Sequence, residues 1–140
     1  MVALSKAQAE RQAARLAGVR ADLQATYAVA LLAWVARPEL ARLGLPIMTQ
    51  GYRSPAEQDA LYEQGRTKPG LVVTYKRGGE SKHNLVPARA LDVAFLLSNG
   101  QVSWSAELLA KFAGLMKAAS KVVRWGGDWP GFKDRPHFEV

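Results

Sequence analysis

The chain of 140 residues contains no cysteine and only two histidines, His83 and His137. Without cysteine, disulfide bridges and thiolate metal sites are excluded, so a transition metal would have to be bound by histidine and carboxylate side chains. Long apolar runs are also missing, because the longest, at residues 27–36, has roughly half the length of a membrane-spanning helix. We therefore expect no stable insertion into a membrane.

The N-terminal residues 1–18, MVALSKAQAERQAARLAG, lack the apolar segment of a secretory signal peptide. We therefore expect the protein to be made in the cytoplasm without one. A formal net charge of +7 favours an anionic partner, such as nucleic acid, a membrane surface or an acidic wall polymer. The basic residues are scattered rather than gathered in an arginine-rich arm, so we expect no nucleic-acid partner.

Length and patterning predict a single domain, residues 1–140, with a helical part at about 1–43 and a core at about 45–140. Apolar residues three and four positions apart over residues 5–43 predict an amphipathic helix that packs on the core, and Pro38 should break or kink it. Action of this helix on a membrane is the alternative.

The second part of the chain contains signals for both strands and helices. Residues 45–50 are typical of a short strand, and a helix is predicted to begin after Ser54, which forms a capping box with Glu57. The remaining signals predict a strand at 71–75, a hairpin over 89–104 with its turn at Asn99-Gly100, a helix at 105–123 and a last strand at the C-terminus. This order predicts an α+β fold, a small and mainly antiparallel sheet with helices packed against it.

Asp92 lies in the apolar stretch ALDVAF, residues 90–95, where strand alternation places it on the face opposite to its larger apolar neighbours. In the last predicted strand, His137 shares one face with Glu139. Asp92 and His137 can therefore lie on the same open face of one sheet. His83 comes from the polar loop before Asp92, which a bend can bring back over that face.

Two histidines and one aspartate, with a fourth position left for water, are the ligand set of a catalytic zinc site. Zinc would lower the pKa of that water toward ~7. Asp134, three residues before His137, would reach the water without binding the metal and would act first as general base and then as general acid. Asp128 is the competing candidate for this role.

Three further residues are candidates for substrate contacts. Arg53, at the end of the first predicted strand, offers a fixed cation for a substrate carboxylate or a developing oxyanion, unless it pairs with a surface acid. Trp125 and Trp129 either line a substrate cleft or pack in the core or at the rim of the cleft.

Three motifs, in order, resemble the zinc peptidases of the D-alanyl-D-alanine carboxypeptidase and Hedgehog-like superfamily, and among these the phage L-alanyl-D-glutamate endopeptidases. The motifs are GYRSPAEQDALYEQGRTKPG, SKHN followed by ALDV, and WGGDW followed by DRPHFEV. The likeness covers residues 45–140. The chain departs from the family pattern in one place, because eight residues rather than six separate His83 from Asp92 and the usual glycine is missing.

The site residues that the resemblance implies are the zinc ligands His83, Asp92 and His137, the acid/base Asp134, the substrate-binding Arg53, and Ser81 and Gln58 in the lining of the site. It further implies one zinc ion, an Hedgehog/DD-peptidase-like fold, and a monomeric peptidase that cuts the stem peptide of bacterial peptidoglycan at the L-alanyl-D-glutamate bond. The expected setting is a phage endolysin that reaches the host cell wall with the help of a holin and lyses the host. A D-alanyl-D-alanine carboxypeptidase and a non-catalytic wall-binding or virion module are the alternatives.

Overall fold

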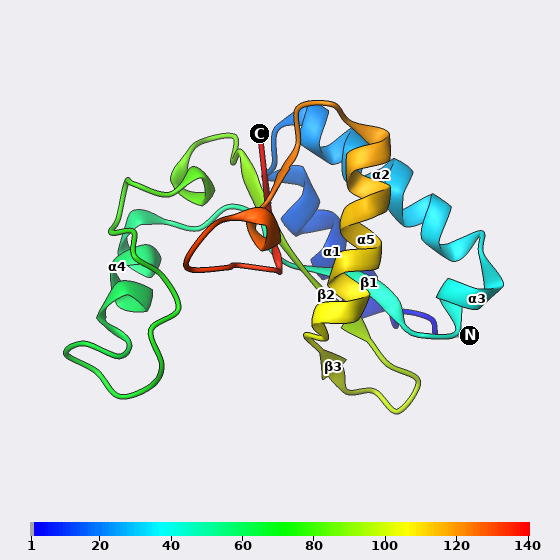
Figure 1. Cartoon of the computed structure of the whole chain (residues 1–140), viewed down its shortest axis with the longest axis horizontal. Helices are drawn as coiled ribbons and strands as arrows, with labels where there is room; N and C mark the ends of the chain where they lie inside the picture. Colours follow the sequence, from blue (N-terminus) through cyan, green and yellow to red (C-terminus); the bar gives the residue numbers. More distant parts are fainter. Residues whose placement is uncertain (1) are drawn as a thin grey trace.

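The structure is a computed structural model that describes residues 2–140 (Figure 1). The described residues contain five α-helices: α1 (Lys6–Ala17), α2 (Ala21–Val35), α3 (Pro38–Ala41), α4 (Pro55–Glu63) and α5 (Ala106–Ala119). They also contain five strands: β1 (Leu45–Gln50), β2 (Ala90–Leu96), β3 (Val102–Ser103), β4 (Arg124–Trp125) and β5 (His137–Glu139). Two short 3-10 helices, η1 (Lys82–Asn84) and η2 (Gly126–Asp128), precede β2 and follow β4.

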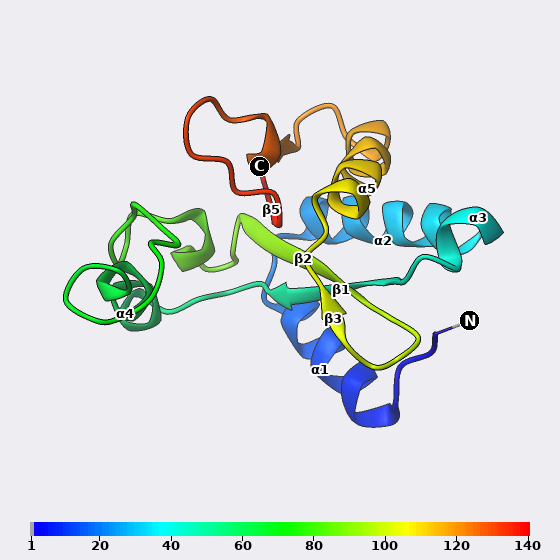
Figure 2. The same ribbon diagram turned by 60° about the horizontal axis from the view of Figure 1, so that its bottom comes forward.

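The five strands form one antiparallel sheet in which β2 has the most neighbours. The order is β1-β2-β5-β4, and β3 pairs with the far end of β2. Helices α2 and α5 pack against each other on one side of the sheet (Figure 2). Helix α1 lies against the outer strand β1, where the side-chain amide of Gln12 donates to the Met48 carbonyl at 2.8 Å and accepts from the Met48 N–H at 2.7 Å. The predicted α+β class is confirmed.

The main hydrophobic core lies between the sheet and the helices α2 and α5. Strand β2 contributes Leu91 and Val93 to this core, and β5 contributes Phe138, all of them fully buried. Because side chains alternate along a strand, Asp92 of β2 and His137 of β5 face the other side of the sheet. The register places these two residues opposite each other. The faces predicted from the sequence pattern are therefore those of the structure.

The predicted helix over residues 5–43 is wrong as one continuous element, because the chain turns after α1 at Gly18. The N–H of Arg20 donates to the carbonyl of Ala88 at 2.8 Å, and the N–H of Ala88 donates to the carbonyl of Gly18 at 2.9 Å. The turn thus pairs with the segment that leads into β2. Helical periodicity cannot reveal a pairing between residues so far apart in the sequence. Pro38 does interrupt the helix as predicted, since it opens the separate helix α3.

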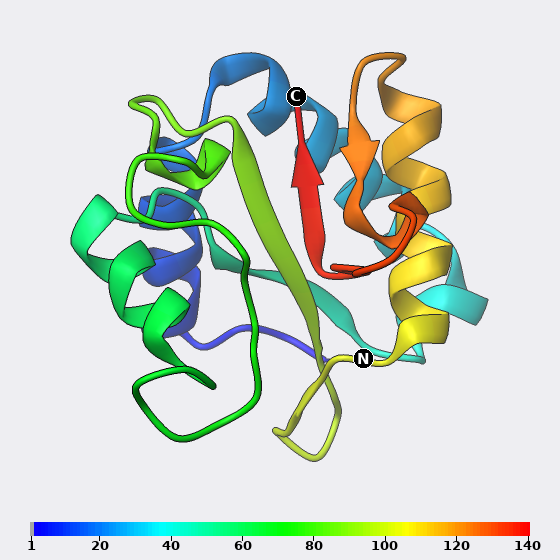
Figure 3. The same ribbon diagram turned by 60° about the vertical axis from the view of Figure 1, so that its left-hand side comes forward.

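The predicted strand at 71–75 is also wrong, because this segment has no strand geometry and the side chains of Leu71, Val73 and Tyr75 are exposed. Side chains hold it in place instead of a sheet. Arg66 Nη2 donates to the Thr74 carbonyl at 3.0 Å while its guanidinium lies over the Tyr62 ring, 3.8 Å from the centroid. Gln58 Nε2 donates to the Thr74 hydroxyl at 3.2 Å. Residues 71–76, called the arm below, lie beside α4 and are drawn in green in Figure 3.

The other predicted elements are confirmed with shifts of a few residues at their ends. The Ser54 hydroxyl accepts from the Glu57 N–H, and the Glu57 carboxylate accepts from the Ser54 N–H, which is the capping box that starts α4. The hairpin between β2 and β3 turns at Gly100, whose φ of +84° suits glycine. No helix within residues 2–140 has the length and apolar character to cross a membrane.

Candidate metal centre

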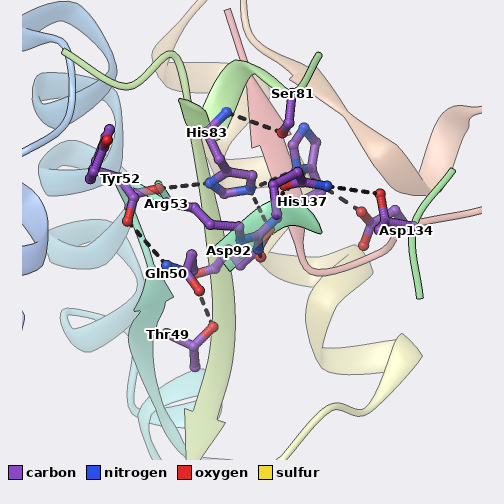
Figure 4. Close-up of polar contacts among 12 residues, drawn as sticks. Thr49, Gln50, Tyr52, Arg53, Ser81, His83, Asp92, Asp134 and His137 are labelled. Atoms are coloured by element: carbon purple, nitrogen blue, oxygen red, sulfur yellow. Dashed lines mark hydrogen bonds and ion pairs between the residues drawn. The ribbon is translucent and has the colours of Figure 1, made fainter. Parts of the chain in front are cut away.

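Three side chains from separate segments converge on the open face of the sheet (Figure 4). His83 comes from η1, Asp92 from β2 and His137 from β5. His83 Nε2 lies 3.3 Å from Asp92 Oδ1 and 3.2 Å from His137 Nδ1, and His137 Nδ1 lies 3.4 Å from Asp92 Oδ1. These three atoms, the metal triangle below, form a nearly equilateral triangle. The structure thus brings together the three residues that the sequence singled out as metal ligands.

Neighbouring groups fix which nitrogen of each histidine faces the metal triangle. His83 Nδ1 lies 2.7 Å from the carbonyl oxygen of Gly51, which can only accept, so this nitrogen carries the proton. His137 Nε2 lies 2.8 Å from the Glu139 carboxylate and donates to it. When both rings are neutral, His83 Nε2 and His137 Nδ1 therefore present lone pairs to each other and to the Asp92 carboxylate. Three electron-rich atoms at this separation repel one another unless a cation lies among them.

The size of the metal triangle fits one face of a tetrahedron around a small divalent ion. With metal–ligand distances of about 2.0–2.1 Å, ligands at tetrahedral angles lie about 3.3–3.4 Å apart. The observed separations of 3.2, 3.3 and 3.4 Å match this spacing. Within residues 2–140, His83, Asp92 and His137 are the His, Asp and Glu residues grouped closely enough to share an ion, so an ion held by them would keep a position for water or substrate.

Glu139 connects the metal triangle to Lys82. Its second oxygen lies 3.1 Å from Lys82 Nζ, and its side chain is buried. Burial raises the pKa of Glu139, but the hydrogen bonds to His137 and Lys82 outweigh it and lower that pKa to about 2. Glu139 is therefore an anion that orients the His137 ring. The sequence pattern predicts that Glu139 shares a face with His137 but predicts no role for it, although the two-residue spacing in His-Phe-Glu is the signal for such a partner.

Metal binding is expected to release a proton from His137. Burial opposes the charge on this imidazole, but the hydrogen bonds to Asp92 and Glu139 outweigh it and raise the pKa of His137 to about 9. The metal-free ring is therefore protonated at neutral pH, whereas a metal ligand must be neutral. Calorimetric titration with Zn²⁺ in buffers of different ionisation enthalpy should report release of about one proton per ion near neutral pH. The affinity should rise with pH up to about 9, and a pH-independent affinity would contradict this.

The same pKa shift makes the stability of the metal-free protein depend on pH. The pKa of His137 is raised from 6.5 to about 9 in the folded protein, so the stabilisation is complete below pH 6.5 and is lost as the pH rises through 9. We expect the melting temperature of chelated protein to fall over this interval. The zinc-loaded protein serves as the control, because its metal-bound imidazole no longer titrates.

The metal triangle lies at the floor of a cleft of about 780 Å³. Residues 72–76 of the arm form one wall of this cleft and residues 129–136 form the other. The rings of Tyr75 and Phe132, one from each wall, meet edge to face with centroids 5.1 Å apart. The cleft is mainly apolar apart from its floor. Such a lining suits a peptide whose polar main chain lies on the floor and whose small apolar side chains contact the walls.

The residues predicted to contact substrate occupy different positions relative to this cleft. Trp129 lines it, and its ring lies 5.2 Å from the His137 imidazole. Ser81 also lines it, and the Ser81 hydroxyl accepts from the His83 N–H at 3.2 Å, which fixes the start of η1. Trp125 packs against the core instead, so the two tryptophans have separate positions.

Arg53 lines the cleft and binds the second oxygen of Asp92, with Nη2 3.3 Å from Oδ2. Its Nη1 donates to Gln58 Oε1 at 2.9 Å. Gln58 is fully buried, is absent from the cleft lining and donates through Nε2 to the Lys76 carbonyl at 2.8 Å. In this arrangement Gln58 positions Arg53 and the arm, while Arg53 fixes the orientation of the Asp92 carboxylate.

Asp134 lies at the edge of the metal triangle, with Oδ2 4.0 Å from His137 Nδ1. This separation exceeds the 3.2–3.4 Å spacing within the metal triangle, so Asp134 lies beside the three ligand atoms and is not one of them. Burial, and then the charge of Asp92, raises the pKa of Asp134, as suits a group that accepts and returns a proton. The competing candidate Asp128 is exposed and pairs with Lys117 outside the cleft. The geometry therefore favours Asp134.

The chain is similar to known peptidases. Residues 75–140 match a family model described as D-alanyl-D-alanine carboxypeptidase. Over 101 residues the chain is 44% identical to the peptidoglycan L-alanyl-D-glutamate endopeptidase CwlK of Bacillus subtilis (strain 168). This alignment covers 67% of the present chain and 59% of CwlK. The chain therefore spans about three fifths of the length of this relative.

Among solved structures, the chain is similar to the L-Ala D-Glu endopeptidase ChiX of Serratia marcescens, with a TM-score of 0.69 and 27% sequence identity. The superposition covers 93% of this chain and 86% of that one, so the likeness extends over most of the fold. Residues 75–140 therefore match the D-alanyl-D-alanine carboxypeptidase family of peptidases, in line with the motif resemblance.

Proposed function

We propose that this protein is a zinc-dependent peptidase that cleaves the L-alanyl-D-glutamate bond in the stem peptide of bacterial peptidoglycan. The observation that carries the proposal is the metal triangle at the floor of the cleft, with the Asp134 carboxylate beside it. The names of the relatives CwlK and ChiX support the choice of bond. The chain spans about three fifths of the length of CwlK, so the activity and the substrate of CwlK are a proposal for this chain.

His83, Asp92 and His137 would hold one zinc ion, since two imidazole nitrogens and one carboxylate oxygen are a donor set that zinc accepts in catalytic sites. When bound, zinc supplies Lewis acidity that polarises the scissile carbonyl and lowers the pKa of water. Asp134 accepts a proton from the attacking water and donates it to the leaving amine nitrogen as the amide bond breaks. Arg53 holds Asp92 in place and adds positive charge near the developing oxyanion.

The biological setting follows from the resemblance and from the charge. We propose a single domain, residues 1–140, that acts on the cell wall as a monomer and that the net charge of +7 retains on the anionic wall polymers. Action as a phage endolysin with holin-dependent release, and use of its lytic activity as an antimicrobial, are predictions from the motif resemblance alone.

Mass spectrometry of digested peptidoglycan tests the bond specificity. Cleavage at L-alanyl-D-glutamate leaves L-alanine on the glycan and releases peptides that begin with glutamate. Release of free D-alanine, with the L-alanyl-D-glutamate bond intact, would instead support a D-alanyl-D-alanine carboxypeptidase, the activity after which the matching family is named. The Asp134→Asn enzyme is the control for cleavage by contaminating hydrolases.

Gly126→Ala is expected to reduce peptidase activity at least about tenfold and to destabilise the fold by about 1–3 kcal/mol. The Gly126 carbonyl accepts the Asp134 N–H at 3.0 Å, and a Cβ at position 126 would lie 2.1 Å from the Asp134 carbonyl oxygen. The loop that carries Asp134 must therefore move. Peptide hydrolysis and thermal unfolding measure the two effects.

Gly114→Ala is the matched control for this substitution. Gly114 lies within α5, and a Cβ there meets no atom within 4 Å. Alanine should stabilise this exposed helical position by roughly 0.5–1 kcal/mol and leave activity unchanged. A Gly126→Ala protein with full activity and stability would show that the close approach of residue 126 to Asp134 is needed neither for catalysis nor for folding.

A further inference from the structure

We propose that Trp104 forms a subsite for the sugar ring to which the stem peptide is attached. The inference rests on the proposed L-alanyl-D-glutamate specificity and extends it from the peptide to the glycan. Trp104 lines the same cleft as the metal triangle, yet 52% of its surface is exposed. An exposed indole at the mouth of a substrate cleft is available to stack on a ligand.

The strand register fixes where Trp104 lies relative to the metal triangle. Strand β3 pairs with β2 so that Ser103 lies opposite Phe95, and the next residue, Trp104, comes to lie beside Ala94. Ala94 lies two residues from Asp92 on the same face of β2. Two residues of a strand span about 7 Å. Trp104 is therefore displaced by about 7 Å along β2 from the carboxylate of the metal triangle.

Trp104 also lies on the same edge of β2 as His137. Strand β1 occupies one edge of β2, from its pairing with Asp92 to its pairing with Leu96. Strands β5 and β3 must therefore share the other edge, β5 at Ala90 to Asp92 and β3 at Phe95 and Leu96. A substrate that lies along this edge meets the metal triangle first and Trp104 next.

The chemistry of peptidoglycan matches this spacing. L-alanine is joined to the sugar through a lactyl group. The scissile carbonyl is therefore separated from the sugar ring by the L-alanine residue and the lactyl group, which is about as long as one amino acid. Two such units span about 7 Å when extended, which equals the displacement of Trp104. The bond between the terminal D-alanines lies several residues further from the sugar, so a sugar subsite at Trp104 suits an L-alanyl-D-glutamate endopeptidase and would be of no use to a D-alanyl-D-alanine carboxypeptidase.

The apolar face of the indole is complementary to the C–H face of a pyranose ring. Covering one face of an indole removes on the order of 60 Å² of apolar surface from water, which corresponds to about tenfold in binding. We therefore expect the zinc-loaded wild-type enzyme to cleave an N-acetylmuramoyl tripeptide with a kcat/KM about tenfold above that for the D-lactoyl tripeptide. The lactoyl peptide is the matched substrate, because it keeps the acyl group on L-alanine and lacks only the sugar.

Trp104→Ala should abolish this preference through a higher KM for the muramoyl substrate, while the rate on the lactoyl peptide stays that of the wild type. Trp104→Phe, which keeps an aromatic face, should retain most of the preference. Leu32→Ala, which removes an exposed apolar side chain on α2 outside the cleft, should change neither rate.

Equal efficiency of the wild type on the two substrates would overturn the sugar subsite while leaving the endopeptidase in place. An equal loss on both substrates in Trp104→Ala would do the same, since the side chain would then serve the fold or the peptide. If the wild type cleaves neither peptide, the proposed bond specificity fails, and the sugar subsite fails with it.

Discussion

Replacing Asp134 with asparagine is expected to lower kcat for the stem peptide by about two to four orders of magnitude, the usual contribution of a general acid–base group. Asparagine keeps the shape of the side chain but can neither accept the proton of the attacking water nor return it to the leaving amine. Asp134 Oδ2 lies 4.0 Å from His137 Nδ1, outside the metal triangle, so zinc content should stay at one ion per chain. Turnover should thus be lost without loss of metal.

Asp128→Asn is the control for Asp134→Asn. Asp128 pairs with Lys117 at the surface and does not line the cleft, so its loss should leave kcat unchanged. If kcat falls in Asp128→Asn while Asp134→Asn keeps full activity, the general acid–base is Asp128 and not Asp134. Lysis that persists unchanged in both variants would remove Asp134 from the mechanism, whereas a wild-type protein that binds the wall without hydrolysing it would favour a non-catalytic wall-binding module.

Asp92→Ala is expected to abolish both zinc retention and detectable hydrolysis, a loss of at least about three orders of magnitude in kcat/KM. It removes one ligand of the metal triangle and also the partner of Arg53, whose side chain is only 11% exposed. Loss of one member of a buried ion pair leaves the other charge without compensation, which costs about 3–5 kcal/mol. We therefore expect the metal-free variant to be less stable than metal-free wild type by several kcal/mol.

Two comparisons separate these effects of Asp92→Ala. Asp92→Asn keeps one oxygen and the hydrogen-bonding shape, so it should recover part of the stability without restoring tight zinc binding. Asp128→Ala breaks an exposed ion pair and should cost no more than about 1 kcal/mol. Elemental analysis after dialysis and denaturant unfolding of chelated protein measure both quantities. An Asp92→Ala protein that retains zinc and activity would exclude Asp92 as a ligand.

The sheet and the metal triangle could be predicted because the relevant signals are local. Alternation along β2 and β5 placed Asp92 and His137 on one face, and the Asn99-Gly100 pair located the hairpin turn after β2. The capping box at Ser54 located the start of α4 within one residue. Each of these signals depends on neighbours within a few residues, so the sequence alone carries it.

The features that could not be predicted depend on residues far apart in the sequence. The break after Gly18 arises from backbone pairing with Ala88, and the Gly51 carbonyl fixes the tautomer of His83. Gln58 carries a helical position in the sequence, but its burial beneath Arg53 becomes visible only when the arm folds over α4. Residues 71–75 have strand composition without a neighbouring strand to pair with.

The most direct test is to measure metal content and peptidase activity together. Purified protein, stripped by a chelator and titrated with Zn²⁺, should regain activity in proportion to bound zinc up to one ion per chain. Full activity in the stripped protein, or saturation with no measurable zinc bound, would contradict a hydrolase built on His83, Asp92 and His137.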